Sequence, residues 1–365
     1  MTDAARCTPG SEMMALEKRI EQLLFEHGAT TVGFATTETL AGGPPSTDLE
    51  YVLPGARSAV CFTMPMDLDN VRPYLGKETP VPEQEPNELY VVIDKISQEV
   101  ADLLIEGGHE AVAVAANWES RPEDPDFFYE PVPPLSHRYI AVASGAASFG
   151  WSGNVGIKGG QGSNVLLGTC VTSAELAPTQ PVLEDEGFCD ECKMCVASCP
   201  VEMFDETEEQ SVTMGGRTFS YSKRVDVVRC MICCAGLTGM HKSGKWGSWS
   251  PGRFVLPEEK EETREAYREA AKRSRSRPIH SSLLVKVNDW GEDHPLTGAQ
   301  IYGSCGVCQR VCHGNRPDRA KNVKVLRRSG VVVQRTDGSL EAMKPQEAAT
   351  AVEGMDPERK KMYDW

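Results

Sequence analysis

Four cysteines near the middle of the chain have a spacing that is typical of iron–sulfur centres. Cys189, Cys192, Cys195 and Cys199 follow the pattern C-x2-C-x2-C-x3-C, and Pro200 comes directly after them. Two-residue gaps allow three thiolates to converge from one tight loop onto a cubane [4Fe–4S] cluster, while the fourth thiolate points toward a second cluster. Zinc sites more often use two separated pairs of ligands, so this motif indicates iron–sulfur chemistry.

A second motif at residues 305–312 predicts a second cluster. Its pattern, C-x2-C-x3-C, brings the total to seven thiolates, whereas two clusters with four cysteines each need eight. The eighth thiolate then comes from the segment VVRCMICCAG at residues 227–236, and the spacing alone leaves its three cysteines open. In ferredoxins with two clusters, the last cysteine of each motif binds the cluster of the other motif. The predicted ligands are Cys189, Cys192, Cys195 and Cys312 for one cluster, and Cys199, Cys305, Cys308 and one of Cys230, Cys233 and Cys234 for the other.

The composition of the chain indicates where the protein resides and which partners it is not expected to bind. The chain has 365 residues, 13 cysteines and a net charge of −15. Since no export signal and no run of about 18 apolar residues is visible, we expect a soluble, cytoplasmic protein with reduced thiols and no membrane span. An acidic surface also argues against binding to a nucleic acid backbone. Outside the cysteine-rich half, we expect Cys61 and Cys170 to be small buried hydrophobic residues and Cys7 to be an exposed thiol.

The first half of the chain reads as a mixed α/β layer that would carry its own core. Apolar periodicity and flanking glycines predict helices at 16–28 and 93–107 and strands at 57–62, 110–115 and 166–172. This order of strand, helix and strand favours a βαβ-like arrangement. We therefore expect an α/β or α+β domain in front of the cysteine-rich domain.

Three further segments organise the rest of the chain. Residues 119–135 are rich in proline, acidic and aromatic residues and predict a loop, and the glycine-rich segment 144–164 is suited to close backbone approach. A linker with two prolines and three consecutive acidic residues, at 178–186, predicts a domain boundary. The charged run at 257–275 predicts a solvated helix. The expected domains are residues 1–180 and 181–322, followed by a tail at 323–365.

The sequence resembles the superfamily of corrinoid-dependent reductive dehalogenases and epoxyqueuosine reductases, as a divergent member. The likeness is carried by GSNVLLGTCVTSAELAPTQPVLEDEGFCDECKMCVASCP at 162–200 and by the later segments VDVVRC and CGVCQRVC. Looser matches are TTVGFA near residue 31, PGARSAV at 54–60 and RYIAVASGAASFGWSGN at 138–154. The resemblance extends from about residue 16 to about residue 320.

The resemblance implies a nitroreductase-like cobalamin-binding domain fused to a ferredoxin-like domain with two [4Fe–4S] clusters. Such an enzyme would take electrons from a donor protein of the ferredoxin or flavodoxin type and pass them through the clusters to cobalt. It would then remove a substituent from a small-molecule substrate, as in dehalogenation or epoxide reduction. The family pattern also implies Cys230 as the eighth cluster ligand. The corrinoid motif D-x-H-x-x-G is absent, which agrees with base-off binding of cobalamin.

The resemblance also implies where the remaining site residues lie. A proton donor beside a reduced corrinoid should be a group that stays protonated until it reacts, and we expect Tyr139, beside Arg138, or else Glu130. Backbone N–H groups of the glycine-rich segment would face the corrin or its phosphate. The expected contacts are Gly150, Trp151, Gly153, Asn154, Gly159, Gly160 and Gly162. Two alternatives stay open at this point: an electron-transfer protein with two clusters, and a reductase with another cofactor such as a flavin.

Overall fold

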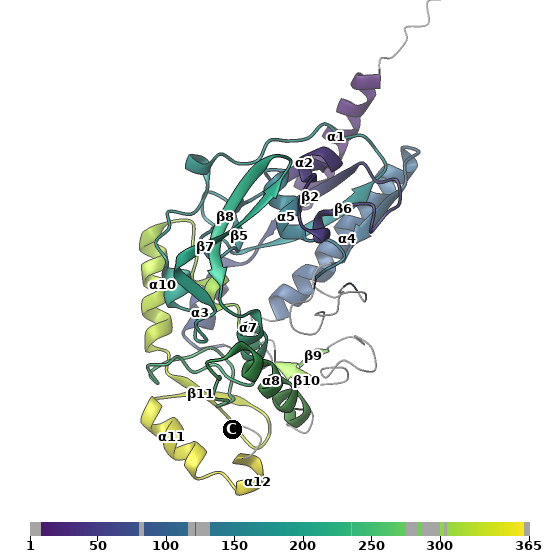
Figure 1. Cartoon of the computed structure of the whole chain (residues 1–365). Coiled ribbons are helices and arrows are strands. Elements are labelled where there is room, and N and C mark those ends of the chain that lie inside the picture. Colours follow the sequence, from purple (N-terminus) through teal and green to yellow (C-terminus); the bar gives the residue numbers. More distant parts are fainter. Residues whose placement is uncertain are drawn as a thin grey trace, which may run out of the picture.

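The structure is a computed structural model, and it describes residues 9–79, 84–115, 121, 132–234, 236–274, 284–286, 300–302 and 305–360. In Figure 1 the α/β layer lies toward one end and the C-terminal helices α11 (Pro345–Glu353) and α12 (Pro357–Lys360) at the other, and the hairpin of β7 (Phe204–Met214) and β8 (Arg217–Arg224) lies between them. The predicted mixed α/β fold is therefore confirmed at this level. No helix among these residues is both long and apolar enough to cross a membrane.

A four-stranded antiparallel sheet is the centre of the first half. Its strands, in spatial order, are β1 (Thr31–Thr36), β2 (Ser58–Pro65), β6 (Val165–Thr172) and β3 (Ala111–Val114). Because β2 and β3 both pair antiparallel with β6, they run parallel to each other on either side of it. Helix α4 (Gln84–Glu106) connects them, so the predicted βαβ order is present with β6 inserted between the two parallel strands.

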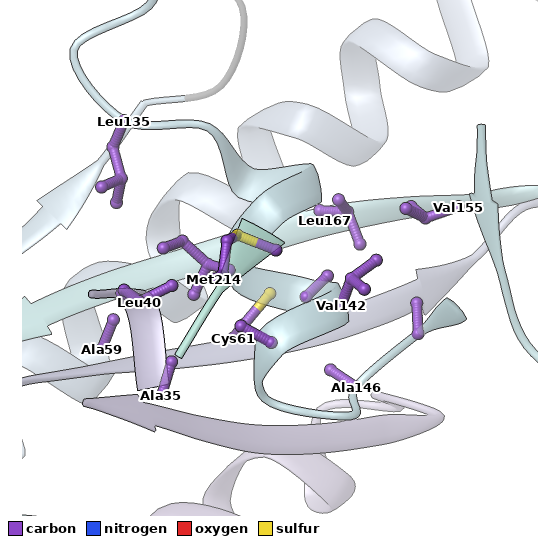
Figure 2. Close-up of a cluster of buried hydrophobic side chains, with 14 of the residues drawn as sticks. Ala35, Leu40, Ala59, Cys61, Leu135, Val142, Ala146, Val155, Leu167 and Met214 are labelled. Carbon is purple, nitrogen blue, oxygen red and sulfur yellow. The ribbon is translucent and has the colours of Figure 1, made fainter. Parts of the chain in front are cut away.

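Each face of this sheet packs against its own set of helices. Helices α1 (Pro9–Glu26) and α4 cover one face, where Val60 and Phe62 point. Helices α2 (Thr37–Leu40) and α5 (His137–Ala143) lie on the other face, where Ala59 and Cys61 point. Figure 2 shows Cys61 among the apolar side chains of this second core. The alternation of strand residues between two buried faces explains why β2 and β6 read as continuous apolar runs.

The cysteine-rich half contributes a hairpin to the core of the first half. Strands β7 (Phe204–Met214) and β8 (Arg217–Arg224) form this hairpin. Its residues Val212, Met214 and Tyr221 are buried in the same core as Cys61 (Figure 2 labels Met214). This hairpin was not predicted from the sequence.

Contacts in the opposite direction come from α3 (Val71–Leu75), which follows β2. Tyr74 packs among the residues around the cysteines, and its carbonyl accepts a hydrogen bond from Trp249 Nε1 at 3.0 Å. The ammonium group of Lys77 donates to the carbonyl of Gly247 at 2.8 Å. Residues of each half thus pack into the core of the other half, across the domain boundary that we expected at residue 180.

The remaining elements hold the cysteines and the tail. They are β4 (Ser148–Phe149), β5 (Val155–Gly156), α6 (Met194–Ala197), α7 (Val227–Cys234), α8 (Lys260–Ser274), β9 (Leu284–Lys286), β10 (Gln300–Tyr302), α9 (Val307–Arg310), α10 (Arg316–Arg328), β11 (Val331–Gln334), β12 (Leu340–Met343), α11 (Pro345–Glu353) and α12 (Pro357–Lys360). Helix α8 confirms the predicted charged helix. Val323, Leu326 and Val332 pack with the cysteine-bearing core, so the expected tail begins inside a packed helix.

Candidate functional site

Two groups of cysteines come together in the second half. The first cysteine group, Cys189, Cys192, Cys195 and Cys312, lines one small enclosed space beside Trp151 and Arg319. These residues come from the loop before α6, from α6 itself and from the end of α9. The backbone at Glu191 and Lys193 is left-handed, with φ of 52° and 54°, which is how the loop turns tightly enough to place three cysteines together.

Hydrogen-bond donors point at the sulfur atoms of the first cysteine group. The backbone N–H of Trp151 lies 3.3 Å from Cys189 Sγ, and Arg319 Nη1 lies 3.2 Å from Cys192 Sγ. Burial raises the pKa of the Cys312 thiol to about 12, and the neighbouring Cys195 adds to the rise. Donors of this kind stabilise a thiolate that a metal has deprotonated, so the group fits an iron–sulfur cluster.

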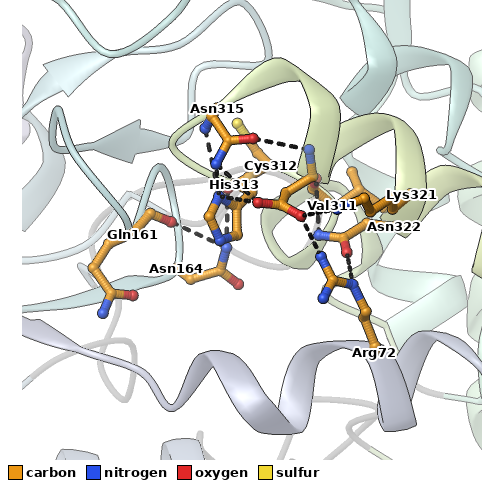
Figure 3. A network of polar contacts seen from close by, with 10 residues as sticks. Arg72, Gln161, Asn164, Val311, Cys312, His313, Asn315, Lys321 and Asn322 are labelled. Carbon is orange, nitrogen blue, oxygen red and sulfur yellow. Dashed lines mark hydrogen bonds and ion pairs between the residues drawn. The ribbon is translucent and has the colours of Figure 1, made fainter.

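The glycine-rich segment fixes the position of Cys312. The carbonyl of Cys312 accepts hydrogen bonds from the side chain of Asn164 at 2.9 Å and from the backbone N–H of Ser163 at 3.1 Å. Figure 3 shows this contact within a network that extends through Asn315 and Asn322 to Arg72 on α3. Residues from three distant segments of the chain therefore hold the last cysteine of the second motif in place.

The second cysteine group consists of Cys199, Cys305, Cys308 and Cys230. Burial raises the pKa of the Cys199 thiol to about 12, and the nearby Cys305 and Cys230 thiols contribute to the rise. Burial likewise raises the pKa of Cys308, with the other three as neighbours. The backbone N–H of Met203 points at Cys199 Sγ at 3.4 Å. This group, too, has donors aimed at sulfur.

Two additional cysteines lie against the second cysteine group. Cys234 Sγ is 3.9 Å from Cys230 Sγ, and Cys233 Sγ is 3.4 Å from the hydroxyl of Ser248. Both thiols also interact with Cys305. In the described part of the chain, no three His, Cys, Asp or Glu side chains converge in the way that holds a metal ion. Both cluster sites, including the choice of the eighth ligand among the three cysteines of α7, therefore stay predictions.

A cavity of about 610 Å³ is lined mainly by residues of the first half, with Arg224 and Gln309 from the second half. Its wall includes Asn154, whose side-chain N–H donates to Cys308 Sγ at 3.4 Å. Its apolar walls come largely from β6 and from residues 132–135, and Tyr139 and Arg224 lie on its polar side. This volume is within the range of about 300–1,000 Å³ that is usual for small-molecule sites.

Tyr139 lines this cavity from α5, and its hydroxyl lies 3.2 Å from the hydroxyl of Tyr221 on β8. Burial, together with that hydrogen bond, raises the pKa of Tyr139 to about 12. The pKa of Tyr221, by contrast, lies below its ordinary value. Burial acts to raise it, but the hydrogen bond from Tyr139 and the charges of Arg138 and Arg224 outweigh the effect of burial. Sequence reasoning missed Tyr221, although its alternation with Phe219 after Gly215-Gly216 was a hairpin signal.

The residues expected to contact a corrinoid lie in different environments. Asn154 lines the cavity, and Trp151 lies beside the first cysteine group. A Cβ atom would meet nothing within 4 Å at Gly159 and Gly160. At Gly150, Gly153 and Gly162, however, it would lie 2.8 Å or less from Phe188, from Tyr221 and from the backbone of Cys312, respectively. The close approach that these last three glycines permit is to other parts of the protein.

The remaining candidate residues either pack in the protein core or lie outside the described residues. Cys61 and Cys170 are buried on β2 and β6, which confirms the expectation that they are small hydrophobic residues. Glu130, the second candidate acid, lies outside the described residues, as do Cys7 and most of the predicted loop at 119–135.

No family model matches this chain, and neither does any curated protein. Among solved structures, a catabolic reductive dehalogenase is similar to 59% of this chain and to 28% of its own length, with 15% identity and a TM-score of 0.45. An epoxyqueuosine reductase with a tRNA stem loop is similar to 62% of this chain and 59% of its own, with 15% identity and a TM-score of 0.39. Epoxyqueuosine reductase from Streptococcus thermophilus is similar over 55% of both chains, with 14% identity and a TM-score of 0.34. This chain thus spans less than two thirds of these proteins, which belong to the two groups that its sequence resembles.

Proposed function

We propose that the protein is an oxidoreductase in which two [4Fe–4S] clusters deliver electrons to the 610 Å³ cavity for the reductive removal of a substituent from a small molecule. One observation carries the proposal. The side chain of Asn154 lines the cavity and also donates to Cys308 Sγ at 3.4 Å, so the second cysteine group borders the cavity through a single residue. Electrons on a cluster bound there would have a short path to a substrate.

The two cysteine groups support two clusters on the ligands that the motifs indicate. One cluster would be held by the first cysteine group, and the other by Cys199, Cys305, Cys308 and Cys230. Each cluster supplies one-electron reduction, and its potential is adjusted by hydrogen bonds to the sulfurs. The donors on Cys189, Cys192, Cys199 and Cys308 serve this purpose in the proposal. We propose that a ferredoxin- or flavodoxin-type protein supplies the electrons.

Cobalamin belongs to the proposal because of the sequence resemblance, and the residues of the cavity fit it only in part. Asn154 lines the cavity, and Gly159 and Gly160 have open space above them. The other three expected glycines contact protein atoms, and the cavity volume suits a substrate-sized molecule. The proton-transfer roles that we propose therefore involve only residues of this chain.

Tyr139 is the proposed proton donor. Its phenol lines the cavity, and a pKa of about 12 keeps it protonated until a strong base forms in contact with it. The hydroxyl of Tyr221, 3.2 Å away, would then return the proton, because its pKa is lower than that of an ordinary tyrosine. Arg138 lies 5.5 Å from the Tyr139 ring and stabilises negative charge on the pair. We propose a small-molecule substrate rather than nucleic acid, since the chain carries a net charge of −15.

Anaerobic purification followed by metal and cofactor analysis tests this proposal. The protein should contain about eight irons per chain and bind hydroxocobalamin one to one under reducing conditions. Replacing Cys230 with alanine should lower the iron content to about four, whereas the matched variant Cys233→Ala should leave it unchanged. Full iron loading without corrinoid binding would remove cobalamin from the proposal. If the protein then shows the visible spectrum of a flavin, flavin would take the place of cobalamin as the proposed cofactor. A chain that binds no iron would refute the proposal as a whole.

A further inference from the structure

Two arginines face the 610 Å³ cavity from different elements. Arg138 lies in the first turn of α5, and Arg224 ends β8, the second strand of the inserted hairpin. Arg138 Nη1 donates to the carbonyl of Gly153 at 2.7 Å, which fixes its guanidinium group. The Nε atom of Arg224 is buried, and no hydrogen-bond partner for it exists among the described residues. Two cationic groups therefore line the cavity, and Arg224 Nε is a buried donor that no described residue satisfies.

Neither arginine forms an ion pair within the part of the chain that the structure describes. Other basic residues of the chain do so: Lys223, directly before Arg224, pairs with Glu208 at 2.6 Å, and Arg72 on α3 pairs with Asp318 at 2.6 Å. Acidic residues are not scarce, because the chain has 53 of them against 38 lysines and arginines. Burial and the charge of Arg224 lower the pKa of Arg138, while the neighbouring Tyr139 and Tyr221 act to raise it, so the two guanidinium groups repel each other beside two neutral phenols. Two like charges in a partly buried site are unfavourable unless an anion accompanies them.

We infer that the substrate supplies this anion, and that the cavity binds a small organic acid whose carboxylate or phosphate group is held between Arg138 and Arg224. The inference deepens the proposed function, because it takes the cavity to be the substrate site of the proposed reductase. Arginine suits this task, since its planar fork of donors matches the two oxygens of a carboxylate or phosphate.

Part of the cavity wall is apolar, which indicates that the ligand has an apolar portion. Leu135, Val155 and Leu167 line the cavity, and they belong to the same core as Cys61. An acid held by the two arginines would place its apolar body along these side chains. Asn154, the contact to Cys308, lies on the same cavity. The anion would thus orient the ligand, and one of its two anchors belongs to the inserted hairpin.

Isothermal titration of the anaerobically purified full chain tests this inference with defined probes. Benzoate and phenyl phosphate each combine an anionic group with an apolar ring, benzamide has the ring without the charge, and inorganic phosphate has the charge without the ring. We expect at least one of the two organic anions to bind and to bind more tightly than benzamide. Arg138→Gln and Arg224→Gln should each weaken that binding at least about tenfold, because each removes a charge-assisted hydrogen bond. Neither variant should change benzamide binding.

Lys223→Gln is the matched control, because it removes one positive charge from the neighbouring position of the same strand. It should leave binding of the organic anion unchanged. Equal weakening by Lys223→Gln, no weakening by either arginine variant, or binding of inorganic phosphate alone would overturn the inference. Preference for benzoate or for phenyl phosphate identifies the anionic group. If Arg138→Gln loses its iron, Arg224→Gln decides the outcome from a separate element. Failure of cobalamin binding is measured independently and leaves this result unaffected.

Discussion

Replacing Arg319 with methionine should make the cluster proposed for the first cysteine group harder to reduce. Arg319 is only 3% exposed, and its guanidinium group lies 3.2 Å from Cys192 Sγ and pairs with Asp190. Reduction adds negative charge to a cluster, and a nearby cation stabilises the reduced form. Removal of that cation should therefore shift the reduction potential to a more negative value.

The size of the shift follows from this geometry. Two unit charges 3.2 Å apart interact by roughly 5 kcal/mol at an effective dielectric constant of about 20. The added electron is spread over the whole cluster, and Asp190 cancels part of the charge of Arg319, so about 1.4–2.8 kcal/mol is a reasonable net effect. For a one-electron couple this corresponds to about 60–120 mV.

A redox titration followed by electron paramagnetic resonance measures this shift. Lys321→Met is the control, since Lys321 lies on the same helix but is exposed and pairs with Asp318 at 3.2 Å. Asp190→Asn should move the potential in the opposite direction. A potential for Arg319→Met that is unchanged or more positive, with iron content retained, would contradict the assignment of this charge to the cluster.

Two further predictions concern buried positions at the junction of the two halves. Lys77→Met should stabilise the protein most at low pH. Burial lowers the pKa of Lys77 to about 7 in the folded protein, whereas the lysine of the unfolded chain keeps a pKa near 10.5. Between these two pH values the unfolded chain binds one more proton than the folded protein, so the free energy of unfolding of the wild type rises from about pH 7 toward pH 10.5. Thermal midpoints at pH 7 and pH 9.5 should show the advantage of the variant shrinking, and a constant difference would contradict this. Gly162→Ala should lower iron content, because Gly162 has a φ of 59° and its Cβ would lie 2.5 Å from the Cys312 carbonyl oxygen, whereas Gly160→Ala, which has open space, should not.

Local patterns were sufficient to predict α1, α4, β2, β3 and β6 of the first half, whereas β1, α2, α3 and α5 were not predicted. The apolar face of α4 and the continuous apolar runs of β2 and β6 are properties of short segments, and burial on one or both sides explains them directly. The cysteine motifs also carry much of their own geometry. The structure brings Cys312 beside Cys189, Cys192 and Cys195, the grouping that the spacing favours, because the loop and the short helices that hold them turn within a few residues.

The cavity could not be predicted in the same way, because its residues meet only through tertiary packing. Arg224 and Tyr221 lie on a strand with many charged neighbours, and their positions depend on where the hairpin packs. Tyr139 was expected from its neighbour Arg138, but its partner Tyr221 is 82 positions away in the sequence. The packing of α3 against Trp249 likewise joins residues that no local pattern connects.

Shortening the hairpin would separate its structural role from its contribution to the cavity. Glu209 pairs with Ser222, so Asn-Gly in place of residues 210–221 would close the ladder there with a two-residue turn and leave Arg224 in position. The change removes Val212, Met214 and Tyr221 from the core, and loss of each large buried side chain is worth about 2–5 kcal/mol. We expect the thermal midpoint to fall by about 10 °C or more.

Tyr221→Phe is the comparison for this variant, because it removes only the hydroxyl that contacts Tyr139, worth about 1 kcal/mol. Its midpoint should fall by a few degrees at most. Iron content should stay unchanged in both variants, since none of the removed residues belongs to either cysteine group. If the shortened chain melts at the wild-type temperature, the hairpin is not part of the core, and the position of Arg224 on the cavity loses its structural basis. If it melts early yet still binds an organic anion, packing of the hairpin tip and anion binding through Arg224 are independent properties of the same insertion.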